Sequence, residues 1–171
     1  ISAIDSVEFL PGFKLFMKFS DPFYPDVISC ETPHGEKTYY DAAYNKDAED
    51  HVFALIATGS SAQEYYQLAN EEAIVEQVLS ELDALYDGTA TTSYTGEYIL
   101  KDWGQQVHTL GTWTSNQTDA STHTLLTRSL EDRVHFAGAT FKVSDPLYMR
   151  GSVHGAILSG YGAAEIIIEN Q

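Results

Sequence analysis

The sequence predicts an α+β protein, because strand-like and helix-like stretches follow one another in blocks along the chain. Short apolar runs bounded by turn residues come first. An amphipathic helix pattern and further strand-like runs follow, and a long helix of small and apolar residues closes the chain. No internal repeat and no low-complexity tract interrupts this order.

Four apolar runs predict strands in the first part of the chain. Each run is short, and Gly, Pro or Asp residues lie beside it, which is the usual punctuation between strands. The fourth run contains Val-Phe-Ala-Leu-Ile-Ala and is continuously apolar, which predicts a strand buried on both faces. The four predicted strands span residues 13–19, 27–30, 37–44 and 51–58.

Residues 70–86 give the clearest helix pattern. Asn70 is a suitable N-cap, acidic residues fill the first turn, and apolar residues recur every three or four positions until Gly88. We expect this helix to pack on a sheet and to carry no chemistry. The later expected elements are a strand at 94–103, a strand or loop at 109–114, a last strand at 134–137 and a helix at 151–168.

The composition limits the classes of function. The chain has 171 residues, enough for one domain with a hydrophobic core, and a formal net charge of −16. This charge argues against nucleic acid as a partner, because phosphate binding needs Lys and Arg. It suits a cationic substrate or partner, and it serves solubility equally well. No apolar run is long enough for a membrane span, and the single cysteine, Cys30, excludes an internal disulfide.

The last predicted helix is rich in Gly and Ala, which makes it a poor helix former by itself. Each interior Gly costs about 1 kcal/mol relative to Ala. Such a composition is expected where something approaches the backbone closely. The partner is either a neighbouring helix or a flat ligand at the helix N-terminus, where free N–H groups favour negative charge.

Two motifs resemble the flavin-containing amine oxidases, a family that includes monoamine oxidases, polyamine oxidases and flavin-dependent histone demethylases. The first is Phe-Ala-Gly at 136–138, followed after a loop by Gly-x-x-His-Gly-Ala-x-x-Ser-Gly-x-x-Ala-Ala at 151–164. The second is the segment 11–24, in which Lys14 precedes an apolar run and then Pro-Phe-Tyr. The resemblance covers nearly the whole chain but only the C-terminal part of a complete amine oxidase.

The resemblance implies two parts. Residues 1–108 would form part of a mixed-sheet substrate-binding domain, and residues 109–171 the flavin-contacting last strand and helix of an FAD-binding dinucleotide fold. The Gly-x-Gly-x-x-Gly motif of that fold is absent from this chain. We therefore expect a partner chain or a removed segment to carry it, and we expect the isolated chain to be inactive.

The activity implied by the resemblance is FAD-dependent oxidation of a small-molecule amine. A hydride passes to flavin N5, the imine hydrolyses, and hydrogen peroxide is released. An L-amino-acid oxidase of the same fold is an alternative, for which Arg150 is the only local residue able to bind a carboxylate. Two others are a desaturase or isomerase-like relative and a non-catalytic interaction domain descended from an oxidase.

Lys14 and Trp113 are the predicted catalytic residues, and each has two interpretations. From the pattern alone, Lys14 lies at a sheet edge with its amine in water, or it points into a polar cavity. The resemblance assigns it the family's lysine that hydrogen-bonds a water at flavin N5. Trp113 is either a core residue or, by the resemblance, the aromatic wall past which the substrate amine moves to the flavin.

The resemblance also predicts cofactor contacts. Trp103 and Gly111 belong to its Trp, spacer and Gly-x-aromatic segment. Thr112 stands where monoamine oxidases have the cysteine that bonds FAD covalently. Because a hydroxyl cannot form that thioether, we expect non-covalent FAD. Gly138 matches the family's glycine at the ribityl and pyrophosphate end, and Ala139 replaces the acidic residue that usually follows it.

Three further predicted contacts open the last helix. Gly151, Ser152 and Val153 match the family positions that face the N1–C2=O2 edge of the flavin. At a helix N-terminus the backbone dipole stabilises negative charge on the reduced ring. Ser152 is also the expected N-cap of this helix.

Overall fold

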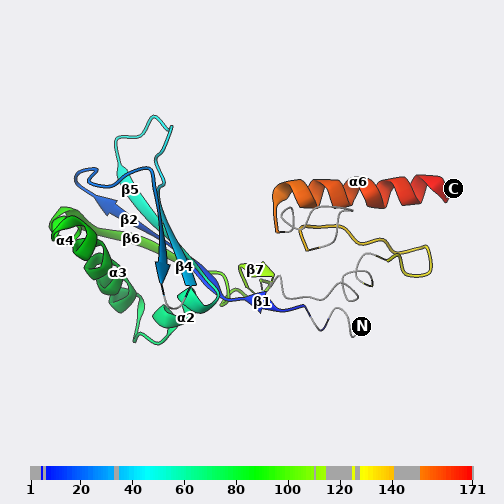
Figure 1. Cartoon of the computed structure of the whole chain (residues 1–171), viewed down its shortest axis with the longest axis horizontal. Helices are drawn as coiled ribbons and strands as arrows, with labels where there is room; N and C mark the ends of the chain where they lie inside the picture. Colours follow the sequence, from blue (N-terminus) through cyan, green and yellow to red (C-terminus); the bar gives the residue numbers. More distant parts are fainter. Residues whose placement is uncertain are drawn as a thin grey trace. The chain divides into compact units, whose positions relative to one another are not determined.

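The computed structural model describes residues 5, 7–32, 35–109, 111–114, 125, 128–140 and 151–170. The chain forms two compact units. One comprises Leu10–Thr112, and the other comprises Ile1–Phe9 and Trp113–Gln171. The first unit carries a five-stranded sheet with its helices, and the second carries the long helix α6 (Val153–Glu169) (Figure 1).

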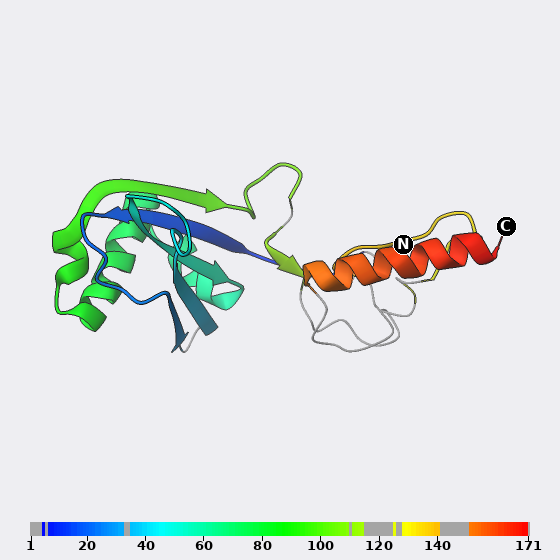
Figure 2. The same cartoon turned by 90° about the horizontal axis from the view of Figure 1, so that it is seen from above.

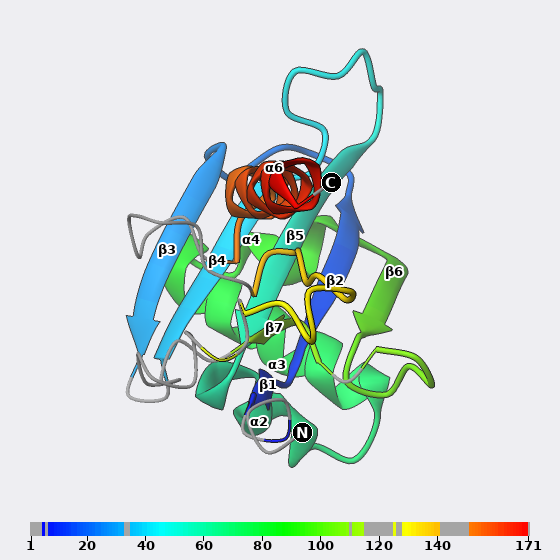
Figure 3. The ribbon, with the colours of Figure 1, turned by 90° about the vertical axis from the view of Figure 1, so that its right-hand side faces the viewer.

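The sheet of the first unit has the strand order β3-β4-β5-β2-β6, which can be followed from one edge to the other in Figure 3. Strand β2 carries the predicted Lys14, and β6 forms the edge beside it (Figure 2). The strands are β2 (Gly12–Phe19), β3 (Val27–Thr32), β4 (Gly35–Asp41), β5 (His51–Thr58) and β6 (Tyr94–Asp102).

The described strand pairs of this sheet are all antiparallel, so the expectation of a mixed sheet is wrong for this part. The reason is the position of β2. Strands β5 and β6 run in the same direction and are joined through helices, as in a parallel unit, but β2 lies between them and runs the opposite way. The connecting helices are α2 (Ser60–Tyr66), α3 (Glu71–Tyr86) and α4 (Thr89–Ser93).

The predicted strands 13–19, 27–30, 37–44, 51–58 and 94–103 all form, and so do both predicted helices. Asn70 caps α3 as expected, because its side chain accepts a hydrogen bond from the Ala73 amide at 2.9 Å. The short helices α2 and α4 were not predicted. Neither has a side-chain N-cap bond, and Gly59 and Gly88 precede them with positive φ angles.

One predicted strand is wrong. Residues 134–137 form no strand, and only an isolated antiparallel bridge joins Leu130 to Val134. An apolar run becomes a strand only where a second strand supplies backbone partners, and the described residues provide none for this run. The uncertain segment 109–114 contains the short strand β7 (Trp113–Thr114), which pairs with β1 (Phe9–Leu10).

Helices α2, α3 and α4 cover one face of the sheet (Figures 1 and 3). Alternate residues of β2 point to this face, as the pleat requires, and they are at most 2% exposed. The apolar stripe of α3 packs against them in one cluster. The buried β2 residues are Phe13, Leu15, Met17 and Phe19, and those of α3 are Ile74, Val75, Val78, Leu79 and Leu82.

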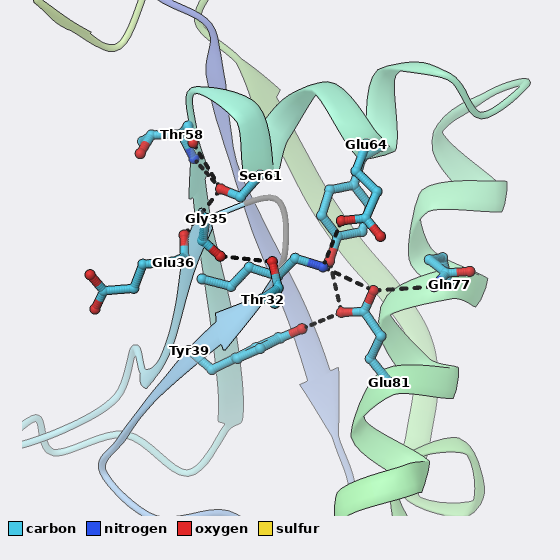
Figure 4. A network of polar contacts seen from close by, with 11 residues as sticks. Thr32, Gly35, Glu36, Tyr39, Thr58, Ser61, Glu64, Gln77 and Glu81 are labelled. Atoms are coloured by element: carbon cyan, nitrogen blue, oxygen red, sulfur yellow. Dashed lines mark hydrogen bonds and ion pairs between the residues drawn. The ribbon is translucent and has the colours of Figure 1, made fainter. Parts of the chain in front are cut away.

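A polar cluster lies within this helix-covered side (Figure 4). The Lys37 side chain is only 4% exposed, and its Nζ lies 3.2 Å from Glu81 Oε1 and 3.3 Å from Glu64 Oε2. The hydroxyls of Tyr39 and Tyr65 both donate to Glu81 Oε2 at 2.7 Å. Among the described residues Glu64 Oε2 accepts no hydrogen bond, so its contact with Lys37 is an ion pair only.

This cluster shifts the pKa values of its members. Burial opposes ionisation of Glu81, but hydrogen bonds from Tyr39 and Tyr65 and the charge of Lys37 hold its pKa below the ordinary 4.5. Burial and the nearby Glu81 raise the pKa of both tyrosines far above the ordinary value. We assign the cluster a structural role, because it joins α2 and α3 to β4 inside the core.

The second unit is built on α6. Ser152 caps this helix as predicted, since its side chain accepts from the Gly155 amide at 3.0 Å. Along α6 only Gly155 and Ser159 are buried, and most of its large apolar side chains are exposed. In the described part of the chain, no helix is long and apolar enough to cross a membrane.

Candidate active site

The face of the sheet opposite the helices carries the predicted lysine. Lys14, Phe16 and Lys18 alternate with the buried residues of β2 and are half-buried. Within this unit no described helix or strand covers this face, and we call it the open face. Its residues follow directly from the strand register, because residues paired across antiparallel strands point to the same side.

Two rows of side chains cross the open face. The first row runs across all five strands and is apolar apart from one hydroxyl: Val27, Tyr40, Ala54, Phe16 and Ile99. The second row is Ser29, Thr38, Ile56, Lys14 and Lys101. Ala54 is fully buried although it does not belong to the core cluster under the helices, which is consistent with its place between the rings of Tyr40 and Phe16.

The two lysines of β2 on this face differ in their partners. Lys18 Nζ lies 3.0 Å from Asp50 and 3.7 Å from Glu97, and the hydrogen bond to Asp50 raises the pKa of Lys18. Lys14 has no hydrogen bond and no ion pair to any described residue. A half-buried amine without a partner is unusual, because it gives up part of its hydration without a replacement.

Lys101 lies directly opposite Lys14 on the edge strand. Its Nζ donates to Gln106 Oε1 at 2.8 Å and sits 5.6 Å from the centre of the Trp103 ring. The ring of Trp103 thus contacts a cation of the protein itself, and its backbone amide donates to the Gly12 carbonyl at 3.2 Å. Trp103 holds the end of β6 beside the start of β2.

Thr112, predicted at the position of the family's flavin-bonding cysteine, is held by the backbone of the strand β1. Its amide and its hydroxyl both donate to the Leu10 carbonyl, at 2.9 and 3.2 Å. Its methyl group lies against Gly12, where an added Cβ would come within 2.9 Å of it. Gly111 is buried beside it. Position 12 therefore needs a glycine, because Thr112 packs closely against it.

Trp113, predicted as the aromatic wall, lies against Gly151 in the second unit. A Cβ added at Gly151 would come within 2.6 to 2.9 Å of three atoms of the Trp113 indole. Gly151 also has a φ of +71°, which a side chain would disfavour. Its amide donates to the Ala139 carbonyl at 2.9 Å. Trp113, Ala139 and Gly151 therefore belong to one local arrangement in front of α6.

Gly138 is attached to α6 by Ser159, a residue to which the sequence analysis gave no role. The Gly138 amide donates to Ser159 Oγ at 2.8 Å, and this hydroxyl lies 3.1 Å from the Gly138 carbonyl and 2.9 Å from that of Ala156. Ser159 is buried. The sequence gave no signal for this bond, because Gly138 and Ser159 lie 21 positions apart.

The start of α6 leaves backbone donors available. The first amides of any helix have no intrahelical acceptor, and the Ser152 side chain accepts from that of Gly155. Val153 is 73% exposed. The arrangement can hold partial negative charge at this end of the helix.

The predicted residues thus fall into two groups. Lys14, Trp103, Gly111 and Thr112 belong to the first unit, and Trp113, Gly138, Ala139, Gly151, Ser152 and Val153 belong to the second. Arg150, considered for a carboxylate, lies outside the described residues. No group of His, Cys, Asp and Glu in the described ranges could hold a metal ion.

The model of one protein family, the flavin containing amine oxidoreductases, matches residues 1–168. The chain belongs to this family. The resemblance seen in the sequence motifs is therefore confirmed. No curated protein sequence matches the chain significantly.

Solved structures with the same fold include a cyclohexylamine oxidase from Brevibacterium oxydans IH-35A, with a TM-score of 0.71 at 18% identity. A putrescine oxidase redesigned in its cofactor binding gives a TM-score of 0.73 at 17% identity. The matches cover 96% and 98% of this chain but only 36% and 37% of those proteins. The chain thus spans little more than a third of the length of either structure.

Membership of a flavin-containing family implies a flavin cofactor, and the residues present fit a flat anionic ring. At the start of α6, the first amides have no acceptor within the helix. In the first unit, the open face offers an amine that no described residue binds.

Proposed function

We propose that this chain provides the substrate-facing sheet and the C-terminal flavin contacts of an FAD-dependent amine oxidase. The observation that carries the proposal is Lys14, a half-buried amine on the open face that no described residue neutralises or hydrogen-bonds. Family membership supplies the chemistry that this amine would serve. The complete activity needs the dinucleotide-binding part, which this chain does not contain.

When bound, FAD supplies the acceptor for the hydride that leaves the carbon next to the amine, and oxygen then yields hydrogen peroxide. Lys14 donates a hydrogen bond to a water molecule and holds it in place, since an amine that no described residue hydrogen-bonds is satisfied by water. The apolar row beside Lys14 excludes further water from the reacting carbon.

Trp113 presents an aromatic face that orients the amine. The first amides of α6, at Val153 and the residue after it, would help to hold FAD, and the helix dipole there would favour negative charge on the reduced cofactor. The Thr112 hydroxyl cannot form a thioether, so FAD is held without a covalent bond at this position. Gly138, Ala139 and Gly151 would contact FAD as the family resemblance implies; Gly138 is held to α6 through Ser159, and Gly151 donates to the Ala139 carbonyl.

The rest of the flavin-binding part is proposed to cover α6. Several apolar side chains of this helix are more than half exposed within the chain, which is unusual for a helix of a monomeric unit. They are Val153, Ile157, Tyr161 and Ile168. The match covers only 36% and 37% of the two solved proteins, so most of their length has no counterpart in this chain. A corresponding part of the complete enzyme would be large enough to cover α6.

The test uses the assembled protein, which we define as this chain together with the part that carries the dinucleotide-binding motif. Oxidised flavin should absorb near about 450 nm, and acid precipitation should release it into the supernatant if it is not covalently bound. An amine should bleach this absorbance without oxygen, and peroxide should form in air. Bound flavin that no amine or amino acid reduces would indicate a non-catalytic descendant.

A further inference from the structure

We propose that the open face selects amines whose remaining part is apolar and uncharged, and that it discriminates against diamines and polyamines. This inference rests on the proposed function, because it takes the reacting amine to lie close to Lys14. It concerns which part of a substrate the side chains beside Lys14 can contact.

The apolar row offers a continuous contact for a hydrocarbon group. Phe16 is two residues from Lys14 on the same strand and face, and its cross-strand neighbours are Ala54 and Ile99. Directly paired positions in a sheet bring side chains within contact distance. Tyr40 continues the row beyond Ala54. A substrate bound at Lys14 can therefore lay an apolar group across Phe16 toward either neighbour.

The charges around Lys14 disfavour a second cation. Lys101 is directly opposite Lys14, and its Nζ is fixed by Gln106 and the Trp103 ring without any carboxylate among the described residues. Two like charges in directly opposite positions already repel each other. An additional ammonium would meet this repulsion and would lose water without gaining an acceptor.

The carboxylates of the open face lie away from this region or are already paired. Asp50 and Glu97 are bound to Lys18. Glu31 and Glu36 oppose each other on β3 and β4, two or more strands from β2. Figure 4 shows Glu36 pointing away from the buried polar cluster. Neither row that contains Phe16 or Lys14 includes an acidic residue.

The two lysines do not form a good carboxylate site either. Lysine is a point charge without the two-pronged geometry that arginine offers a carboxylate. Lys101 is already bound to Gln106. We therefore assign the face to an uncharged group, and an amino acid serves as a competing substrate in the test.

The experiment compares kcat/KM of the assembled protein for hexylamine, 1,5-diaminopentane and L-leucine. The first two have the same length and differ only in whether the far end is a methyl group or an ammonium. We expect hexylamine to be preferred over both others by at least about tenfold, the scale of unfavourable like-charge contacts. Equal or better rates with the diamine would overturn the inference while leaving the proposed function intact, and equal or better rates with L-leucine would overturn the inference and favour the amino-acid oxidase alternative. If none of the three reduces the flavin, the proposed function itself fails.

A pair of variants locates the effect. Ile99→Glu places a carboxylate beside Phe16 at a position that is 69% exposed, so the fold should tolerate it. It should lower the preference for hexylamine over the diamine by about tenfold. Val107→Glu adds the same charge in the loop after β6, outside the sheet, and should leave the preference within about twofold. Equal effects of both variants would mean that overall charge, and not the open face, sets the preference.

Discussion

The two faces of the five-stranded sheet use the same strands for different purposes. On the helix-covered face, Phe13 and Leu15 are fully buried in an apolar cluster, and the buried Lys37 is neutralised by two carboxylates. On the open face, the neighbouring Lys14 and Phe16 are half-buried, and Lys14 has no partner among the described residues. One alternating strand therefore separates residues that stabilise the fold from residues that remain available to a substrate.

The largest difference between the faces should appear in stability. Phe13→Ala removes a ring at the centre of the core and should lower the free energy of unfolding by about 3–5 kcal/mol. Phe16→Ala, on the same strand but the open face, should lower it by no more than about 1 kcal/mol. Denaturant unfolding of both variants measures this contrast. A loss of several kcal/mol in Phe16→Ala would mean that the open face is part of a core.

The buried polar cluster should contribute less than the apolar core. Glu81→Gln replaces one carboxylate oxygen and removes one of the two charges that neutralise Lys37, which should lower the free energy of unfolding by about 1–3 kcal/mol. Glu76→Gln, an exposed change on the same helix, should stay within about 0.5 kcal/mol. If the two variants unfold alike, the cluster does not stabilise the unit.

The same cluster predicts how stability depends on pH. Because the folded pKa of Glu81 lies below the ordinary 4.5, the unfolded chain takes up this proton first as the pH falls. Its contribution is therefore present at neutral pH and is lost below about pH 4.5. The raised pKa values of Tyr39 and Tyr65 give the opposite dependence, a loss as the pH rises above about 10. Thermal melts across pH should show both losses, with a weaker acid loss in Glu81→Gln.

Local patterns predicted much of this fold, because caps and periodicity act over a few residues. Asn70 and the stripe of α3 marked that helix, and the short apolar run around Lys14 marked β2. The place of β2 between β5 and β6 could not be predicted, since strand order depends on contacts far apart in sequence. For the same reason, the apolar run at 134–137 was wrongly predicted as a strand: its sequence does not show whether a partner strand lies beside it.

The sequence predicted which residues belong to the site, but it did not predict what surrounds them. The motif around Lys14 indicated a functional lysine. Only the structure shows that Lys18 has an ion pair, whereas Lys14 has none among the described residues, and that Lys14 lies opposite Lys101. The bond between Lys37 and Glu81 joins residues 44 positions apart, and no short pattern reports such a contact.

The central claim, that the open-face lysine without a partner among the described residues serves the reaction, is tested most directly by comparing Lys14→Met with Lys18→Met. The measurement is peroxide-producing turnover of hexylamine by the assembled protein, normalised to bound flavin. Loss of the Lys14 amine should lower turnover on the order of 10²-fold, the usual scale for a positioned proton-handling group. The Lys18 variant should stay within about threefold of the unchanged protein, because that lysine only pairs with surface carboxylates. Full turnover in Lys14→Met, or an equal loss in both variants, would contradict the account.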